Sequence, residues 1–386
     1  MEVALSLTLL IGAGLLMRSF VALRDVDLGL QADQVFQTFL ALPPDRYRTA
    51  EQIAGFFRPL LSRLKALPGV VHAAASSAIP LLNFGESKIE IAGKTPAEER
   101  QSLFQRVSEE YFETLRIEFK QGRGFSEVEI NEARKVAVVS ETFVRKYLPN
   151  ENPIGRRVHL ASLDTSADPL HDKGFKIVGV VDDARNRGLH VPTDPEVWVP
   201  YTIAGSGARV LMLRTAVDPG AMMKAVRQEV WATDSGVALV YPSTLEDRIA
   251  EQLYAGPRFG SLLMTVFGCI GLILVTVGVY SVLAFSTTQK THEIGIRMAL
   301  GAEAADVLRL IVGTGLRLVV GGIAIGIAGS LVLGRAIETQ LVGVAVYDPP
   351  TFAATTLLLM ITAAIACWIP ARRAARVDPM VALRDE

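Results

Sequence analysis

The sequence predicts a membrane protein with an α-helical four-span transmembrane unit and a large α/β domain outside the membrane. Half of the 386 residues are hydrophobic while 20% are charged, and the mean hydropathy is +0.33. This mixture is too apolar for an ordinary soluble enzyme and too polar for a chain made only of membrane helices. The long apolar runs lie near the two ends, and the region between them carries alternating strand and helix signals.

Three apolar stretches in the C-terminal third are long enough to cross a bilayer, which takes about 20 helical residues. We predict transmembrane helices at about 259–286, 311–334 and 351–370. Only Arg317, near its start, interrupts the second stretch. We expect Arg317 to reach the interface along its aliphatic stem rather than to be a buried functional charge.

The N-terminal stretch, Val3 to Met17, is apolar but short, so a secretory signal peptide is an alternative to a membrane span. No basic segment precedes it and no small-residue cleavage pattern follows it. The sequence therefore predicts a first transmembrane helix within residues 1–23, truncated at its N-terminal end.

Positive charge sets the expected orientation, because cytoplasmic loops are enriched in basic residues. The connector 287–306 and the tail after the last span are basic, so both are predicted to be cytoplasmic, and residues 24–257 then form the domain outside. The positions behind this assignment are Lys290, His292, Arg297, Arg309, Arg372, Arg373, Arg376 and Arg384. Arg18 and Arg24 fall on the outer side, against the rule.

The outside domain contains two β-α-β units of similar length. In the first, Thr49 and Gln52 form a capping-box pattern before an apolar face at helical spacing. In the second, Asp218 and Pro219 open a helix that runs to Trp231. The predicted strands flanking the two helices are Val35–Leu42, Val70–Ser77, Arg209–Thr215 and Val237–Val240.

An insertion at about 124–205 separates the two units and is predicted to form a lobe of its own. It contains a short helix, Glu141–Tyr147, and four short strands at Val136–Val139, Arg156–Leu160, Phe175–Val181 and Val197–Val199. Asp182 and Asp183 follow one of these strands, where we expect a solvated turn rather than an acid–base or metal pair.

No motif in the chain supports catalysis. The Gly93-Lys94-Thr95 sequence lacks the earlier glycine of a phosphate-binding loop and is predicted to be a hairpin or loop turn. The five histidines lack metal-ligand spacing, and GxSxG, HExxH and CxxC are absent. We therefore predict no catalytic, cofactor-binding or metal-ligating residue. The net charge of −1 gives no basic field for nucleic acid.

The cytoplasmic connector changes abruptly from apolar to mixed charge. Glu293 and Arg297 are four residues apart, in the order that favours a helical ion pair. Ile294, Met298 and Leu300 give the same segment an apolar side. Such a short amphipathic helix suits docking to a cytoplasmic partner, and a simple interfacial helix is the alternative.

The connector and the tail carry the most specific motifs. THEIGIRMALGA, residues 291–302, resembles the EIGIRxALGA signature of the FtsX/MacB-type ABC transporter permeases. PARRAARVDPMVALRDE, residues 370–386, resembles the PAxxAAxxDPxxALR ending of the same family. VSETFVRKYLPNENPIGRRV and FKIVGVVDDAR are similar to the inserted lobe of the MacB-like periplasmic domain. The chain most resembles the C-terminal half of the acidobacterial duplicated orphan permeases.

The resemblance implies a non-enzymatic permease subunit in the bacterial inner membrane, with a MacB-like periplasmic domain at 24–257 and an FtsX-like permease domain at 258–386. It implies a separate ABC ATPase that hydrolyses ATP, no directly bound cofactor, and a second permease unit as homodimer or paired half. Efflux or export is the expected function. The alternative is a non-transporting transducer that activates a periplasmic partner such as a cell-wall hydrolase.

Two further expectations concern the moving parts. The ATPase-coupling segment implied by the resemblance consists of His292, Glu293, Ile294, Gly295, Ile296, Arg297, Ala299, Leu300, Gly301 and Ala302. A helix from Leu245 to Pro257 is the expected stalk into the second span. In the third span, Gly322, Gly326, Ser330 and Gly334 recur every fourth residue and favour close helix packing, inside the unit or in a dimer. A flexible glycine-rich helix is the alternative.

Overall fold

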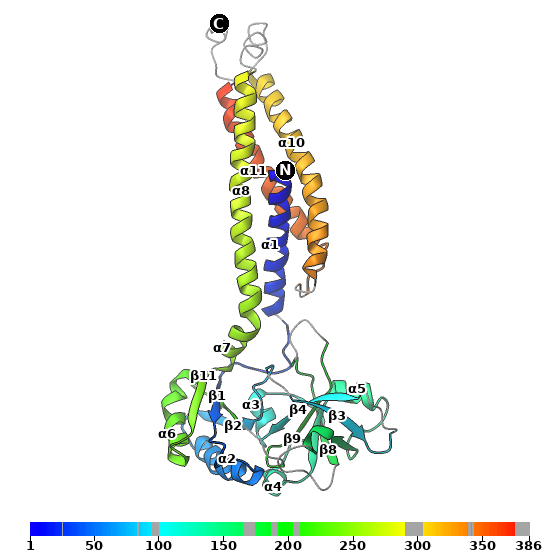
Figure 1. Ribbon diagram of the computed structural model, residues 1–386, viewed down its shortest axis with the longest axis vertical. Coiled ribbons are helices and arrows are strands. Elements are labelled where there is room, and N and C mark those ends of the chain that lie inside the picture. The colour runs from blue at the N-terminus through cyan, green and yellow to red at the C-terminus, as the bar shows by residue number, and fades with distance from the viewer. Residues whose placement is uncertain are drawn as a thin grey trace. The chain divides into compact units, whose positions relative to one another are not determined.

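The computed structural model describes residues 1–24, 26–82, 85–94, 100–164, 174–186, 192–203, 209–289, 304–338, 341 and 343–374. The chain divides into two compact units (Figure 1). The helical unit comprises Met1–Val26 and Tyr254–Glu386, and the α/β domain comprises Asp27–Leu253.

The helical unit contains four helices long and apolar enough to cross a membrane, as predicted. They are α1 (Glu2–Arg24), α8 (Ala255–Gln289), α10 (Ala304–Ala336) and α11 (Pro349–Ala374). Each extends beyond the predicted apolar run, because helical hydrogen bonding continues past the residues that meet hydrocarbon. In particular, the first helix is 23 residues long, well beyond the short run Val3–Met17.

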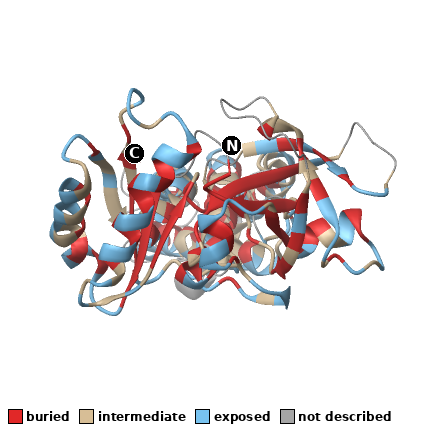
Figure 2. Ribbon diagram, turned by 90° about the horizontal axis from the view of Figure 1, so that it is seen from below, coloured by how far each residue is buried: buried red, intermediate tan, exposed pale blue. Residues whose placement is uncertain are grey.

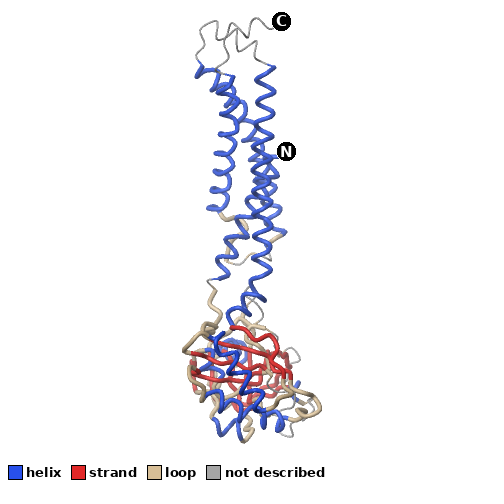
Figure 3. Tube along the Cα trace, turned by 90° about the vertical axis from the view of Figure 1, so that its left-hand side faces the viewer, coloured by secondary structure: helices blue, strands red, loops and turns tan. Residues whose placement is uncertain are grey.

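The four helices are not equally buried within the helical unit. Of the apolar window of α1, 50% is buried, against 17% for α8 and 22% each for α10 and α11. The outer helices expose large apolar side chains along their length, among them Phe259, Ile273 and Ile325. Figures 1 and 3 show α1 running beside α8 and α10. Hence α1 is the central helix, and lipid solvates the exposed faces of the others.

One half of the α/β domain is a four-stranded antiparallel sheet in the order β11-β1-β10-β2. The strands are β1 (Val35–Ala41), β2 (Val70–Ser76), β10 (Val210–Thr215) and β11 (Ala238–Thr244). Strand β10 lies between β1 and β2, and β1 lies between β10 and β11. Both predicted β-α-β units are therefore present, and they interlock as a split β-α-β arrangement.

Helices α2 (Ala50–Lys65) and α6 (Met223–Thr233) belong to these two units. The predicted capping box is confirmed, since the Thr49 hydroxyl accepts from the Gln52 N–H and the Gln52 side chain accepts from the Thr49 N–H. Asp218 caps the 3-10 turn η2 (Pro219–Met222) that opens into α6. Figure 2 shows buried strands beneath helices that turn one face to solvent.

The other half of the domain is a closed ring of six strands: β3 (Gly85–Ile91), β4 (Gln101–Val107), β6 (Val136–Ser140), β7 (Arg157–Leu160), β8 (Phe175–Val181) and β9 (Glu196–Pro200). Strand pairing runs β4-β3-β7-β8-β6-β9 and returns to β4 through a parallel β9–β4 pair. We call this ring the barrel. Strand β5 (Phe119–Gly122) adds to β8 outside the ring.

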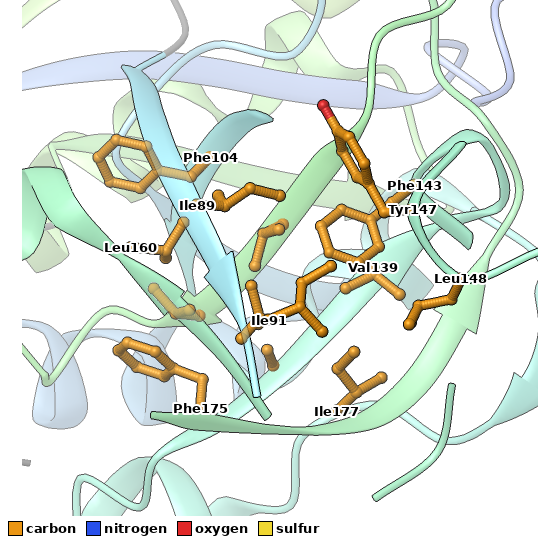
Figure 4. Close-up of a cluster of buried hydrophobic side chains, with 14 of the residues drawn as sticks. Ile89, Ile91, Phe104, Val139, Phe143, Tyr147, Leu148, Leu160, Phe175 and Ile177 are labelled. Atoms are coloured by element: carbon orange, nitrogen blue, oxygen red, sulfur yellow. The ribbon is translucent and has the colours of Figure 1, made fainter. Parts of the chain in front are cut away.

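Alternating residues of the barrel strands fill its interior (Figure 4). The labelled side chains Phe104, Val139, Phe175 and Ile177 come from three different strands, β4, β6 and β8, and belong to one core. The predicted lobe boundary of 124–205 is therefore too late, because β3 and β4 precede residue 124 and their side chains complete the same core. Local sequence patterns indicate single strands and their neighbours along the chain. They could not predict this ring, because β4 and β9 pair although they are far apart in the sequence.

Short helices fill the remaining connections. They are α3 (Tyr111–Leu115), α4 (Glu127–Asn131), α5 (Glu141–Tyr147), η1 (Ala161–Leu163), α7 (Leu245–Ile249) and the π-helical turn η3 (Ala250–Tyr254). The Gly93-Lys94 sequence forms a turn after β3, as predicted, with the Lys94 N–H donating to the Ile91 carbonyl. The prediction of a solvated turn at Asp183 is wrong. Its carboxylate is mostly buried and accepts from the N–H and the hydroxyl of Thr142 at 2.7 and 2.6 Å.

Candidate functional site

The predicted ATPase-coupling segment, His292–Ala302, and the tail motif beyond residue 374 lie outside the described residues. The described helices on either side of the connector show at which end of α8 it starts. Helix α8 has 35 residues and is therefore about 50 Å long, longer than a hydrocarbon core of about 30 Å. Gln289 and Tyr254 thus lie at opposite ends of a membrane-crossing helix, and the connector starts at the Gln289 end.

The small-residue face of α10 packs against α1 within the helical unit. A Cβ atom added at Gly322 would lie 2.7 Å from Val3, and one at Gly326 would lie 2.9 Å from the Ala4 carbonyl oxygen. Ser330 is buried and donates to the Gly326 carbonyl at 2.7 Å. Gly334, in contrast, faces Val346 in the loop before α11. Because glycine has no side chain, α10 can approach α1 closely at Gly322 and Gly326.

Helix α1 makes a second close contact, with α8. The Ser6 hydroxyl donates to the Gly271 carbonyl at 2.9 Å, and a Cβ at Gly268 would lie 3.1 Å from Leu10. The Thr8 hydroxyl donates to the Gly326 carbonyl of α10 at 3.2 Å. Side-chain hydroxyls therefore tie α1 to both neighbours through carbonyls that glycine leaves accessible.

An ion pair joins Arg18 of α1 to Asp348, just before α11. The Asp348 carboxylate also accepts from the Thr351 N–H at 3.0 Å. The Thr351 hydroxyl is the main cause that lowers the pKa of Asp348, and Arg18 adds to it. The pair explains why an arginine is tolerated where the charge rule disfavours it. No sequence signal linked these positions, which are 330 residues apart.

The segment that follows α1 is bound to the α/β domain at both of its ends, which sequence reasoning missed. We call residues 27–34 the strap. At its start, the main-chain N–H of Arg185 donates to the Leu28 carbonyl at 3.2 Å, and the Arg185 Nε donates to the Asp27 carbonyl at 3.2 Å. Near its end, the Gln31 N–H donates to the Leu115 carbonyl of α3 at 2.8 Å.

Arg214 of β10 holds the second half of the strap. Its side chain is buried, and its guanidinium donates to three main-chain carbonyls: Thr114 at 2.7 Å, Asp33 at 3.0 Å and Gln31 at 2.7 Å. Burial is the main cause that lowers the pKa of Arg214. One side chain thus joins the sheet, helix α3 and the strap.

The second connection, which we call the α8 link, is residues 241–254, the end of β11 followed by the helical turns α7 and η3. The predicted stalk from Leu245 to Pro257 is helical as α7, η3 and the start of α8. The link contains two backbone irregularities, one in β11 and one in the helical part. Tyr241 has φ +51° although it is not glycine, and a π-helical turn precedes Pro257. Proline contributes no N–H to a helical ladder, which disturbs regular α-helical bonding at this point.

A buried polar cluster lies beside the strap's first anchor. Glu196 of β9 is fully buried, accepts from Gln105 Nε2 at 3.2 Å and bonds to Asn186 Nδ2. Burial raises the pKa of Glu196 to about 8. Among the described residues no group of three or more His, Cys, Asp or Glu side chains could hold a metal ion. The hydrogen bonds of the cluster join β9 to β4 and to the loop after β8.

Two family models match the chain. Residues 3–233 match the MacB-like periplasmic core domain, and residues 265–379 match the FtsX-like permease C-terminal domain. Together they cover the central helix, both halves of the α/β domain and the connector with its flanking helices.

Named relatives agree with these matches. The chain is 26% identical over 298 residues to the macrolide export ATP-binding/permease protein MacB of Mannheimia succiniciproducens, covering 72% of this chain and 43% of the relative. It is 28% identical over 290 residues to the probable syringafactin export ATP-binding/permease protein SyfD of Pseudomonas syringae, covering 72% and 41%. The chain thus spans less than half the length of these relatives.

Solved structures give a weaker likeness. The periplasmic region of MacB from Actinobacillus actinomycetemcomitans aligns with a TM-score of 0.38 and 14% identity, covering 58% of this chain and 95% of that one. The extracellular domain of YknZ from Gram-positive bacteria aligns with a TM-score of 0.34 and 12% identity, covering 53% and 99%.

Proposed function

The chain belongs to the FtsX-like permeases that carry a MacB-like periplasmic core domain, and from this premise we propose that it couples ATP hydrolysis by a separate ATPase to movement of its α/β domain, for efflux or export. It is a multi-pass inner-membrane protein with its large domain in the periplasm. The permease component of an ABC transporter is not itself the enzyme.

The family match and the lengths of the helices around the connector support this proposal most directly. Helix α8 leaves the α/β domain and crosses the membrane, the connector follows Gln289, and α10 returns from Ala304. A cytoplasmic ATPase that binds the connector could therefore act on both helices at once. Because α10 and α8 both pack on α1, displacement of the connector would reach the central helix.

We further propose that Glu293 and Arg297 are the polar contacts with the ATPase, and that a second permease unit, as homodimer or paired half, completes the transporter. Coupling of this kind needs contacts that differ between two states of the ATPase. The substitution Glu293→Gln removes charge at constant side-chain size, and Arg297→Gln removes charge while keeping a polar, helix-compatible side chain, so they test contact rather than folding.

The proposal is tested by co-expressing the full chain with the ABC ATPases of its genome and measuring co-purification and ATPase stimulation. We expect one ATPase to bind and to be stimulated, and the double variant to lose most of the stimulation. The matched control is Glu132→Gln with Arg134→Gln, an exposed ion pair of the α/β domain. If a complex forms but the Glu293 and Arg297 variants bind and stimulate normally, the coupling assignment is wrong.

Substrate movement separates transport from signalling. In vesicles containing the chain and its ATPase, ATP-dependent movement of a macrolide or syringafactin probe would support export. ATP-dependent activation of a cell-wall hydrolase without movement of either probe would support the transducer alternative.

A further inference from the structure

The strap carries more fixed hydrogen bonds than a connection between two units needs. We propose that Arg214 is a positioning residue that locks the strap to both halves of the α/β domain, so that α1 passes its displacement to the sheet and the barrel together. This inference rests on the proposed function and names the route by which motion enters the domain.

The burial of Arg214 is the first step of the argument. Its side chain is 2% exposed, whereas its strand neighbours Met212 and Leu213 are apolar and fully buried. An apolar residue would fill this position without the cost of burying a charge. The guanidinium is useful here because its fixed fork can satisfy three carbonyls that point to one place, which an apolar side chain cannot do.

The positions of those carbonyls are the second step. Thr114 belongs to α3, while Gln31 and Asp33 belong to the strap. Arg116, directly after α3, donates from its Nη1 to the Gln31 side-chain oxygen at 2.8 Å. The second half of the strap is thus bound to a strand of the sheet and to the helix that follows a barrel strand.

The first half of the strap is fixed independently, at the barrel. Gly29 has φ +73°, which favours glycine, and a Cβ atom there would collide with the carbonyl oxygen of Asp183. Arg185, from the same loop after β8, bonds to Asp27 and Leu28. The loop itself is held by Asp183, which accepts from the N–H of Thr142 at the start of α5.

Little slack separates α1 from these anchors. The helix ends at Arg24 and the first bonded strap residue is Asp27. The three Cα–Cα steps from Arg24 to Asp27 can span only about 10 Å when fully extended. A larger displacement of α1 must therefore pull on the loop after β8 and, through Arg214, on β10 and α3.

Hydrogen exchange on the full chain, in lipid nanodiscs with its partner ATPase, tests this inference with Arg214→Lys. Lysine keeps the charge but loses the fork, so we expect amides of residues 28–33 to exchange at least about tenfold faster, the factor contributed by one hydrogen bond. We also expect the ATP-dependent change in exchange of the barrel strands to be lost, while ATPase binding is retained.

Arg106→Lys is the matched control. Arg106 is also a buried arginine of this domain, at 9% exposure, but its guanidinium lies over the ring of Phe104 in the barrel strand β4, and its Nε makes no hydrogen bond. It should lower the melting temperature without changing the ATP response. Gly29→Ala is the second variant, should Arg214→Lys fail to fold, because it releases the barrel anchor and leaves Arg214 in place. It is expected to weaken the ATP response as well.

The outcomes separate this inference from the proposed function. Unchanged strap exchange in Arg214→Lys, or faster strap exchange with a normal ATP response, overturns the positioning role alone. A wild-type complex whose α/β domain shows no ATP-dependent change overturns the proposed function and this inference with it. Loss of the response in Arg214→Lys and Gly29→Ala, but not in Arg106→Lys, supports the inference.

Discussion

The strap and the α8 link both join the α/β domain to membrane helices, but opposite physical means hold them. The strap has no regular secondary structure, yet a buried arginine and several main-chain hydrogen bonds fix it along its length. The α8 link consists of the end of β11 followed by helical turns, yet it contains Tyr241 with φ +51° and a π-helical turn. The irregular backbone of the strap is held because its polar groups have fixed partners. The helical part of the α8 link is interrupted at the π-helical turn, where regular α-helical hydrogen bonding stops.

This difference suggests unequal roles for the two connections. A tight connection transmits displacement, while an interrupted helix can absorb a change of angle. Buried Leu245 and Ile249 hold α7, and Arg248 adds two contacts of small energy, a stack on Tyr241 at 5.0 Å and a pair with the exposed Glu251 at 3.3 Å. We therefore expect perturbation of the strap to have the larger consequences.

The largest effect is expected when the strap loses its central donor. Arg214→Met leaves the buried Thr114 carbonyl and the partly buried Asp33 and Gln31 carbonyls without this donor, and we expect the free energy of unfolding to fall by about 3 kcal/mol. Urea unfolding of the full chain in detergent, followed by the fluorescence of buried Trp198, measures it. Arg106→Met is the comparison, and it should be neutral or stabilising because that guanidinium's Nε is buried without a hydrogen bond. Equal losses in the two variants would contradict the account.

A smaller effect is expected from pH at the strap's first anchor. Glu196 has its pKa raised from 4.5 to about 8, so between these values the folded domain holds a proton that the unfolded chain has released. Stability should therefore fall as pH rises from about 5 to 8. Because Asn186 joins Glu196 to the anchor loop, the protection factors of residues 27–29, which correct for the intrinsic rise of amide exchange with pH, should fall as pH rises, while those of the α8 link should not.

Glu196→Gln should flatten this pH dependence, as read from melting temperatures at pH 5, 6.5 and 8. Glu129→Gln is the control. Arg123 lowers the pKa of Glu129 to about 2, so this carboxylate stays charged throughout the window and its removal should leave the slope unchanged. A slope that survives in Glu196→Gln would assign the pH effect to another group.

The smallest effect is expected in the α8 link. Pro257→Ala restores an N–H to the helical ladder and should stabilise the link by about 1 kcal/mol, slowing exchange of neighbouring amides about fivefold. Strap exchange should not change. A large effect of Pro257→Ala on the strap would show that the two connections are not independent.

Local signals in the sequence predicted much of the fold. The Thr49 capping box, the helix Glu141–Tyr147 and the three C-terminal spans depend on neighbouring residues or on continuous apolar runs, and the structure confirms them. The barrel's closure could not be predicted this way. Its β9–β4 pair joins Leu103 to Glu196, and no periodicity within either strand specifies that partner.

The site was predicted unevenly for the same reason. The spacing of Gly322 and Gly326 marked a close-packing helix face, but not that α1 would occupy it. In the sequence, Arg214 is only one polar residue in a predicted strand. Its role could not be predicted, because the carbonyls that it binds belong to residues 100 and more positions away. The connector motif was recognised by resemblance, and its coupling role stays a prediction.

The central claim is that ATP-driven displacement enters the α/β domain through the strap. It is tested most directly by the distance between spin labels at Val128 and Val217, two exposed positions of that domain, in the full chain bound to its ATPase with native cysteines replaced. We expect ATP to change this distance in the wild type and in Pro257→Ala, and not in Arg214→Lys. A normal change in Arg214→Lys together with its loss in Pro257→Ala would contradict the account and assign the route to the α8 link.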